Sequence, residues 1–283
     1  MGYHADPKEY WTACSPNYIV RVPDTGDDMD THTASTGTTS ADIARQVNEA
    51  RVNLAAMYRL VELCGWGEGI FNHISMRVPG STREFLIKRH ELGYAEVTAT
   101  NLVCVSMDED LDERSGVNRP GFVLHSTILK ARPDVNCALH IHAPEVVAVS
   151  ALRRGLRMYS QAALRFYKQL GYHAYEGITE SLDEGPRMME ALGRDGVALL
   201  LRNHGAVTVS QTAWGAFSLM RYLVSACKIQ LQVEAAGGEA VEIPEADCAS
   251  ARKQLSSHNT GRAGADWPAW LRRLDAVDSS YRF

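Results

Sequence analysis

The chain has 283 residues, of which 45% are hydrophobic and 22% charged, a composition typical of an ordinary globular protein with one large domain and appendages. Its formal net charge of −5 gives no electrostatic reason to expect nucleic acid or an anionic membrane as a partner. No apolar run approaches the roughly 18–20 residues of a membrane span. The first residues lack the order of a signal peptide, and the six scattered cysteines indicate reduced thiols in a cytoplasmic protein.

The first part of the chain combines a polar arm with a helix and short strands. Residues 1–40 carry no sustained period and are rich in Thr, Asp and Gly toward their end, so we expect a polar arm there. Apolar residues at helical spacing begin near Ser40, and Gly65 is a plausible stop. Four elements are expected next: strands at 72–78, 84–88 and 101–107, and a helix at 121–134.

The second part is dominated by buried strands and a long helix. Strands are expected at 135–143 and 197–203, and helices at 144–152, 184–193, 211–236 and around 267–277. The long helix should bury Trp214, Phe217, Met220, Cys227 and Leu231.

There is no internal repeat, no strict βαβ rhythm, and no dinucleotide or P-loop motif. We therefore predict a three-layer α/β/α domain over residues 41–240. The tail, 241–283, contains four aromatic residues that we expect to pack on the domain or across a subunit interface, Trp267, Trp270, Tyr281 and Phe283.

Two histidines in the expected strand at 135–143 suggest a metal site. Residues i and i+2 of a strand point to the same face, so His140 and His142 project together. A third histidine, His204, follows another strand, and the glycine after it permits a sharp turn. Three neutral imidazoles would leave a coordination position open, which is typical of a catalytic site. A lone histidine at a strand end is more often a hydrogen-bonded structural residue, and spacing alone does not bring His204 to the pair.

Several motifs resemble one known family. The stretches "RPDVNCALHIHAP", "LLRNHGAV" and "NHIS" are similar to the class II aldolase/adducin family, and more closely to its bacterial adducin-like branch, whose chains end much like "DSSYRF". The resemblance covers about residues 41–240. It implies a three-layer α/β/α sandwich around a mostly antiparallel sheet, and homotetramers with active sites at subunit interfaces. It also implies a small-molecule substrate and one divalent ion per subunit, Zn, Fe or Mn, held by His140, His142 and His204.

The sequence departs from the family's sugar-phosphate aldolases at the positions that handle phosphate and protons. Those enzymes carry a Ser-Ser-Glu/Asp pattern where this chain has Arg119, Pro120 and Gly121, so two hydroxyls and the acid/base carboxylate are lost. The family's Gly-Asn turn, another phosphate contact, corresponds to Asn72-His73 here. A phosphate pocket needs amides and small hydroxyls, so we do not expect a sugar-phosphate aldolase.

Other side chains are candidates for the missing roles. Proton transfer is assigned to His125, Tyr172 or His173, and substrate binding to His73, Arg119, Arg165 and Tyr175. His125 follows Gly121 by one helical turn and so faces the same side, and arginine makes bidentate pairs with carboxylates. The alternatives are structural hydrogen bonds for the histidines, packing for the tyrosines and solvated positions for the arginines.

Three functions remain open. The first is a metal-dependent lyase that cleaves a C–C bond, by retro-aldol reaction or decarboxylation, in a non-phosphorylated, carboxylated or aromatic oxo or hydroxy substrate. The second is a non-haem Fe(II) oxygenase that resembles members of this fold in aminocoumarin pathways and acts on an arylpyruvate. The usual oxygenase triad includes a carboxylate, and none is identified here. The third is a non-catalytic interaction domain like that of adducin.

Overall fold

The computed structural model describes residues 39–178, 181–262 and 264–283. The polar arm expected over residues 1–40 lies almost entirely outside the described residues. The helices are α1 (Ser40–Leu63), α2 (Arg119–Ala131), α3 (Pro144–Ala151), α4 (Gly185–Leu192), α5 (Ala213–Ala235), α6 (Glu245–Arg262) and α7 (Trp267–Asp275). The strands are β1 (His73–Arg77), β2 (Glu84–Ile87), β3 (Val103–Ser106), β4 (Cys137–Ile141), β5 (Leu170–His173), β6 (Ala198–Leu201) and β7 (Gly205–Ser210).

The strands form one seven-stranded sheet in the order β3-β2-β1-β4-β7-β6-β5. Every neighbouring pair is antiparallel except β5 and β6. The sheet is therefore mostly antiparallel, as predicted. Its central strand pair, β4 and β7, brings the end of β4 next to the start of β7, with Ile141 opposite Ala206.

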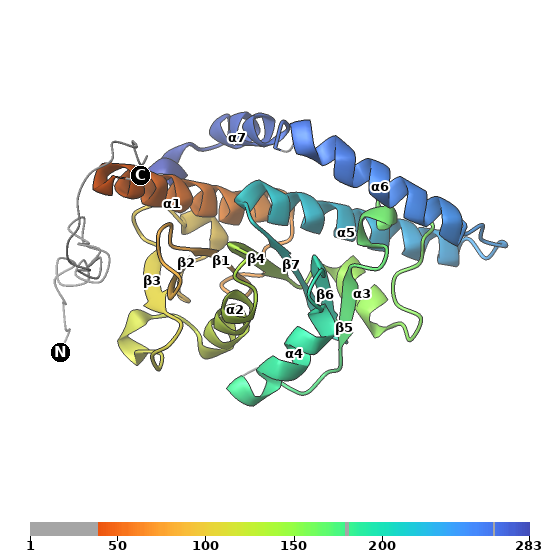
Figure 1. Ribbon diagram of the computed structural model, residues 1–283, viewed down its shortest axis with the longest axis horizontal. Coiled ribbons are helices and arrows are strands. Elements are labelled where there is room, and N and C mark those ends of the chain that lie inside the picture. Colours follow the sequence, from red (N-terminus) through yellow and green to blue (C-terminus); the bar gives the residue numbers. More distant parts are fainter. Residues whose placement is uncertain (1–38, 179–180, 263) are drawn as a thin grey trace, which may run out of the picture.

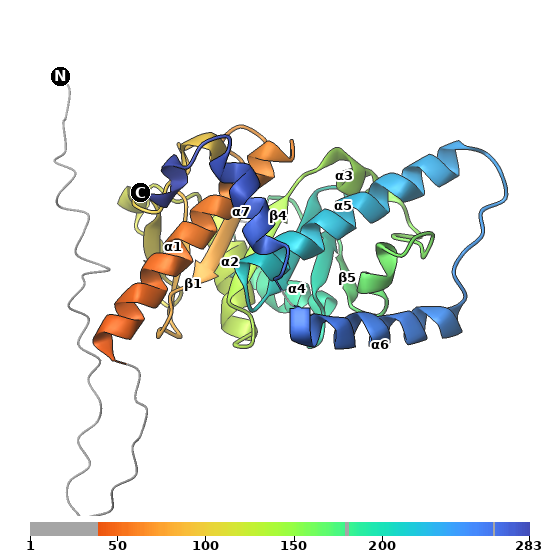
Figure 2. The same ribbon diagram turned by 90° about the horizontal axis from the view of Figure 1, so that it is seen from above.

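Helices cover both faces of the sheet and make three layers (Figures 1 and 2). On one face α1, α3 and α5 enclose the larger apolar core. On the other face α2 and α4 enclose a second core against Phe85, Leu199 and Val207. Both sheet faces are thus buried, which explains the continuous apolar runs in β4 and β6. The predicted three-layer architecture is confirmed.

Both ends of α1 carry residues that favour the start or the end of a helix. At its N-terminus the Thr39 hydroxyl accepts from the Asp42 amide at 3.1 Å, and the Asp42 carboxylate accepts from the Thr39 amide at 3.2 Å, a capping box. Just beyond its C-terminus Gly65 takes a positive φ of +73°, which glycine adopts without strain. The helix therefore begins and stops where the sequence predicts.

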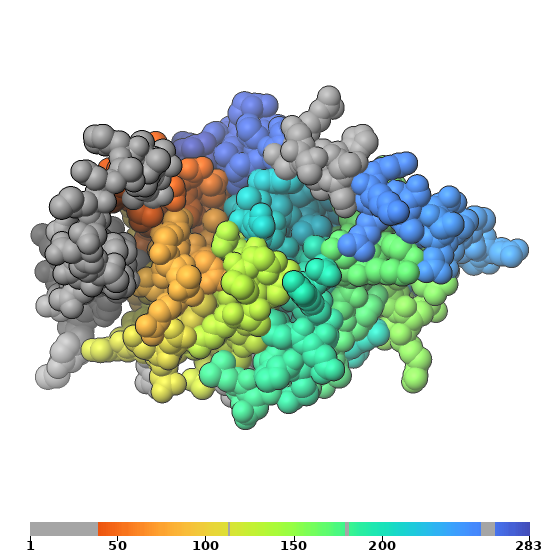
Figure 3. All heavy atoms as spheres, in the orientation of Figure 1, coloured from red at the N-terminus to blue at the C-terminus, as the bar shows by residue number. Residues whose placement is uncertain are grey.

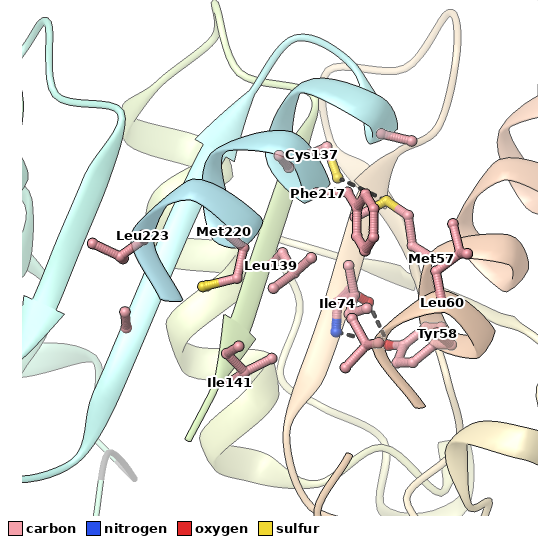
Figure 4. Close-up of a cluster of buried hydrophobic side chains, with 14 of the residues drawn as sticks. Met57, Tyr58, Leu60, Ile74, Cys137, Leu139, Ile141, Phe217, Met220 and Leu223 are labelled. Carbon is pink, nitrogen blue, oxygen red and sulfur yellow. Dashed lines mark hydrogen bonds between the residues drawn. The ribbon is translucent and has the colours of Figure 1, made fainter. Parts of the chain in front are cut away.

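Helices α1 and α5 meet over the centre of the sheet (Figure 4). Phe217 of α5 and Met57 of α1 lie beside Cys137 of β4, and all three are essentially excluded from solvent. Tyr58, also buried, donates its hydroxyl proton to the carbonyl of Ile74 at 2.5 Å and accepts from the Ile74 amide at 2.8 Å. A buried phenol needs such partners, and this pair fixes α1 to the strand that begins with His73.

The C-terminal tail packs on α1 and α5. The rings of Trp267 and Trp270 lie 6.1 and 5.3 Å from the ring of Phe217, and the Trp267 indole donates to Asn53 at 3.1 Å. Tyr281 is fully buried, whereas Phe283 is 73% exposed. Figure 3 shows α7, in dark blue, on the same side of the molecule as α1, in red-orange. Three of the four tail aromatics therefore pack on the core, whereas Phe283 does not pack on the described part of this chain.

Some elements differ from the sequence prediction. The segment before His173 forms β5, residues 205–210 form β7, and α6 lies in a polar stretch for which we predicted no helix. In α5, Trp214 and Leu231 are only half-buried. Among the described residues no helix is both long and apolar enough to cross a membrane.

Candidate metal centre

Three histidines converge where β4 ends and β7 begins. His140 is the fourth residue of β4, His142 follows the strand by one position, and His204 lies in the turn between β6 and β7. One ligand atom from each ring lies within 4.8 Å of the others. The ring centroids are 4.7 Å apart for His142 and His204 and 5.0 Å apart for His140 and His204. The convergence of the third histidine, which spacing alone does not give, results from the pairing of β4 with β7.

The turn that carries His204 depends on an asparagine and a glycine. The His204 amide donates to the carbonyl of Leu201 at 3.1 Å, and Asn203 takes a φ of +59°, a region that asparagine tolerates better than most residues. At Gly205 a Cβ atom would lie 2.5 Å from the Ile141 carbonyl oxygen and 2.9 Å from the His142 ring. Only glycine therefore allows the turn to lie against the ligand-bearing end of β4.

Arg202 anchors the same turn to the neighbouring helix. Its guanidinium donates to the carbonyls of Ser150 and Leu152 at 3.1 and 2.6 Å, at the C-terminal end of α3. Cations are favoured there by the helix dipole. The guanidinium also lies 4.5 Å from the centre of the Tyr172 ring, and the Tyr172 hydroxyl accepts from the Leu156 amide at 2.9 Å. Tyr172 thus packs in the α3 layer rather than beside the three histidines.

Hydrogen bonds at the far ring nitrogens decide which nitrogens can bind an ion. His140 Nδ1 lies 3.0 Å from the carbonyl of Ala206, and His142 Nδ1 lies 2.6 Å from a carboxylate oxygen of Glu68. Carbonyls and carboxylates accept, so both Nδ1 atoms carry the proton. The two Nε2 atoms then face each other at 2.8 Å. In neutral rings both are lone pairs, and a cation between them removes their repulsion.

The ring environments of His140 and His204 favour the neutral imidazole. Burial lowers the pKa of His140 well below its usual value, and the neighbouring His73 lowers it further. Burial likewise lowers the pKa of His204 to about 4, with a smaller contribution from His142. A metal ion requires neutral imidazole as its ligand. The donor set, its second hydrogen bonds and its neutrality fit a divalent ion, with Glu68 completing a carboxylate–histidine–metal arrangement.

A chain of buried polar groups lies beside the His140 ring. The His73 ring stacks on His140 with centroids 4.9 Å apart. His73 Nδ1 lies 2.9 Å from His125 Nε2, and His125 Nδ1 lies 2.6 Å from the Ser75 hydroxyl. His125 is fully buried, and burial lowers its pKa to about 3. Both of its nitrogens are already used, so the ring supports His73 rather than meeting solvent or substrate.

At Gly121, where the aldolases that the sequence resembles carry their acid/base carboxylate, another side chain occupies the space. A Cβ atom at Gly121 would lie 2.8 Å from Cδ2 of His73 and 2.5 Å from the Asn118 side-chain oxygen. The His73 ring thus fills the space into which a side chain at residue 121 would project. Asn72, just before it, has a φ of +64° and a buried amide group that has no hydrogen-bond partner in the described part of the chain.

The remaining candidates from the sequence are scattered. His173 is buried at the end of β5, where its Nε2 lies 2.8 Å from Glu184. Tyr175 is 59% exposed on the following loop. A small cavity of about 10 Å³ is lined by these residues together with His204. Arg119 is exposed at the first position of α2.

Arg165 lies at the opposite edge of the sheet. It lines a larger cavity of about 450 Å³ with Gln169, Val197, Ser210 and Trp214. Gln169 and Val197 precede β5 and β6, and Ser210 ends β7, whereas the histidines lie at the other ends of these strands. The larger cavity is therefore not the histidine site, and the converging donors identify the centre better than cavity size does.

Sequence reasoning missed Glu68, Glu184 and Ser75. Glu68 lies in a glycine-rich turn 74 residues before His142, and nothing local links the two. Glu184 stands at the start of the helix predicted for residues 184–193, and no motif links it to His173. Ser75 belongs to the "NHIS" motif, and strand alternation places it on the same face as His73, so this residue was within reach.

Comparison with known proteins identifies the family of the chain. Residues 52–231 match the family model described as Class II Aldolase and Adducin N-terminal domain. A "Putative aldolase class 2 protein" of Pseudomonas aeruginosa is 39% identical over 252 residues, which cover 86% of this chain and 96% of that protein. Alpha-adducin of Rattus norvegicus is 43% identical over 192 residues, 66% of this chain but only 26% of the adducin.

Solved structures give the same assignment. An aldolase II superfamily protein from Pseudomonas syringae is 38% identical, with a TM-score of 0.78 over 84% of this chain and 96% of that one. The L-fuculose 1-phosphate aldolase from Glaciozyma antarctica is 24% identical, with a TM-score of 0.74 over 90% of this chain and 97% of that one, a likeness of fold alone. The chain belongs to the class II aldolase and adducin family.

Proposed function

We propose that the protein is a divalent-metal-dependent lyase that cleaves a C–C bond, by retro-aldol reaction or decarboxylation. His140, His142 and His204 would hold the ion, with Glu68 behind His142. The observation that carries this proposal is the pair of Nε2 atoms 2.8 Å apart whose rings already donate through Nδ1. When bound, a divalent ion supplies a Lewis acid that polarises a substrate carbonyl.

The proposed substrate is a non-phosphorylated oxo or hydroxy acid, aromatic or aliphatic. The family's phosphate-binding serines correspond to Arg119 and Pro120, and the acid/base position is Gly121, whose side-chain space is filled by His73. With the hydroxyls lost, these two positions offer no small donors to a phosphate. The exposed Arg119 at the start of α2 would bind a carboxylate instead.

We also propose that the protein is a homotetramer whose active sites lie at the subunit interfaces. Three large apolar side chains are exposed on the segments around the small cavity: Tyr175 at 59%, Ile178 at 72% and Leu182 at 50%. A cluster of exposed apolar groups beside a polar site is typical of an interaction surface. A partner subunit there would enclose the substrate.

A second candidate is a non-catalytic role like that of adducin. It is supported by the 43% identity to alpha-adducin, although this chain spans only 26% of that protein's length. The two functions differ in one respect that can be measured without a substrate, because an interaction domain needs no metal ion.

The deciding experiment is elemental analysis of untagged protein purified without added metal, aerobically and anaerobically. We expect about one equivalent of divalent metal in the parent and a large loss in His140→Ala and His204→Ala. Glu49→Gln, an exposed change on α1, is the control. Zn or Mn that is stable in air supports the lyase. Iron lost in air, with oxygen uptake on arylpyruvates, would favour the oxygenase, and no metal at all would favour the adducin-like role.

A further inference from the structure

A buried histidine–carboxylate pair lies beside the metal centre. His173 ends β5 and is 4% exposed, and its Nε2 lies 2.8 Å from Oε1 of Glu184. Glu184 immediately precedes α4, and its side chain is 11% exposed. Because an ionised carboxylate only accepts, Nε2 of the imidazole donates. This leaves Nδ1 as the nitrogen that can exchange a proton, and it has no hydrogen-bond partner among the described residues.

Other charged groups hold this pair in place. Glu176 lies 3.8 Å from His173 Nε2, and it is bound through both oxygens by the guanidinium of Arg187. Arg187 also donates to the carbonyl of Asp183 at 2.9 Å, next to Glu184 in the chain. The groups that face the imidazole are therefore two carboxylates, with one guanidinium that neutralises the outer carboxylate. A ring restrained in this way keeps one orientation.

The pair shares a cavity with the metal centre. The void of about 10 Å³ is lined by His173, Glu176, Glu184, Tyr175 and His204, and this volume is close to the least that holds one water. His173 and His204 therefore border the same void, which has room for about one water. Tyr175 lines the same void and is 59% exposed.

The other candidates for proton transfer are less well placed. Both nitrogens of His125 are occupied by His73 and Ser75, and the ring is fully buried. His73 uses Nδ1 toward His125 and stacks on a ligand ring. The Tyr172 hydroxyl lies in the opposite layer against the Leu156 amide. Of the residues considered, His173 alone combines an orienting carboxylate with a cavity that reaches the centre.

We propose that His173 is the catalytic acid/base of this enzyme and that Glu184 is its positioning residue. This inference rests on the proposed lyase function. In a retro-aldol cleavage, His173 Nδ1 takes the proton of the substrate hydroxyl as the C–C bond breaks. The hydroxyl carbon becomes a carbonyl, and the electron pair of the broken bond becomes the C=C bond of an enolate. The same nitrogen then gives the proton to the enolate carbon, so that no other reactant is consumed, and the reverse of this last step exchanges the methyl protons of pyruvate. The pair replaces the carboxylate that Gly121 lacks.

The test uses the metal-replete full chain with pyruvate in D₂O, where NMR follows exchange of the methyl protons. We expect exchange above the rate with free metal ion, and a loss of about 100-fold in His173→Asn, the lower range for removal of an acid/base group. Glu184→Gln should lose about tenfold. Glu190→Gln, exposed on the same helix, should match the parent. All four proteins should hold the same amount of metal.

A second readout separates positioning from a structural role. ¹⁵N NMR of the His173 ring should show the Nε2–H form in the parent and a mixture of forms in Glu184→Gln. Parental exchange that survives in His173→Asn would overturn this inference and leave the lyase proposal intact, and metal lost from His173→Asn would also count against it. A metal-replete parent without any exchange would overturn the proposed function itself.

Discussion

In each imidazole that we propose as a metal ligand, the partner of one ring nitrogen determines whether the other nitrogen can bind an ion. In His142 the partner of Nδ1 is Glu68, at 2.6 Å, whereas in His140 it is a backbone carbonyl. A backbone partner cannot be removed by substitution, but a carboxylate can. Glu68 is also 56% exposed on its side chain, so its replacement leaves the core intact. Substitution of Glu68 is therefore the most direct test of the proposed metal centre.

We predict that Glu68→Gln weakens metal binding by about tenfold, because loss of the charge lowers the basicity of the His142 ring. The dissociation constant for Zn²⁺ would be measured by competition with a chromophoric chelator. Glu49→Gln, exposed on α1, should leave it unchanged. Equal affinity in Glu68→Gln and the parent would show that the carboxylate has no part in the site.

A second prediction concerns pH and the buried His125. Its pKa is about 3 in the folded protein because of burial, against about 6.5 in an unfolded chain. Above that higher value both states hold a neutral ring, and no stability is lost. As the pH falls below it, only the unfolded chain takes up the proton. Stability therefore decreases by about 1.4 kcal/mol per pH unit until the folded pKa is reached.

His125→Gln should make the free energy of unfolding less dependent on pH between pH 6 and pH 4. The decrease in slope should correspond to about one proton fewer taken up on unfolding. The measurement is the free energy of unfolding in urea at several pH values, compared as slopes, since the substitution also changes stability at neutral pH. A variant whose slope equals that of the parent would mean that His125 is protonated equally in both states. Protonation of the proposed metal ligands at low pH contributes equally to the slopes of the parent and the variant, so it cancels when the two are compared.

At the scale of elements, the turn between β6 and β7 builds the centre. We predict that Gly205→Ala lowers stability by about 1–3 kcal/mol and reduces metal occupancy, because the new Cβ would lie 2.5 Å from the Ile141 carbonyl. Chemical denaturation and elemental analysis measure the two effects. Gly238→Ala is the matched control, because nothing lies within 4 Å of a Cβ there. If Gly205→Ala behaved like this control, the turn would not position His142.

Elements with a strong local signal could be predicted from sequence. The helical spacing of apolar residues in α1 and the apolar runs of β4 and β6 made the layers predictable. The residues of β5 and β7 form short runs that contain Gly, and they become strands through pairing with β6. The polar helix α6 has little apolar periodicity for a sequence prediction to detect.

The candidate site likewise contains some residues that sequence predicts and others that it does not. His140 and His142 follow from strand alternation, and His204 follows only from the family resemblance. Glu68 and Glu184 join the site through contacts that span 74 and 11 residues. The sequence offers no period or motif that marks either contact, so only the folded chain reveals them.

For the whole molecule, the end of the chain closes the fold. The carbonyls of Tyr281 and Phe283 accept from the amides of Ala99 and Thr100 at 2.9 and 3.1 Å. The buried Tyr281 hydroxyl donates to Asp275 at 2.9 Å. Together with Trp267 and Trp270, these contacts join the tail to α1, to α5 and to the loop before β3. The tail should therefore unfold together with the domain.

We predict that Tyr281→Ala lowers the free energy of unfolding by about 3 kcal/mol, since it removes a fully buried aromatic ring. Phe283→Ala, two residues later, should change it by less than about 0.5 kcal/mol, because that ring is 73% exposed. Urea denaturation followed by tryptophan fluorescence reports on both the tail and the core, through Trp267 and Trp66. A single transition that shifts only in Tyr281→Ala is expected. Two separate transitions in the parent would mean that the tail is an independent appendage and that the domain ends before α7.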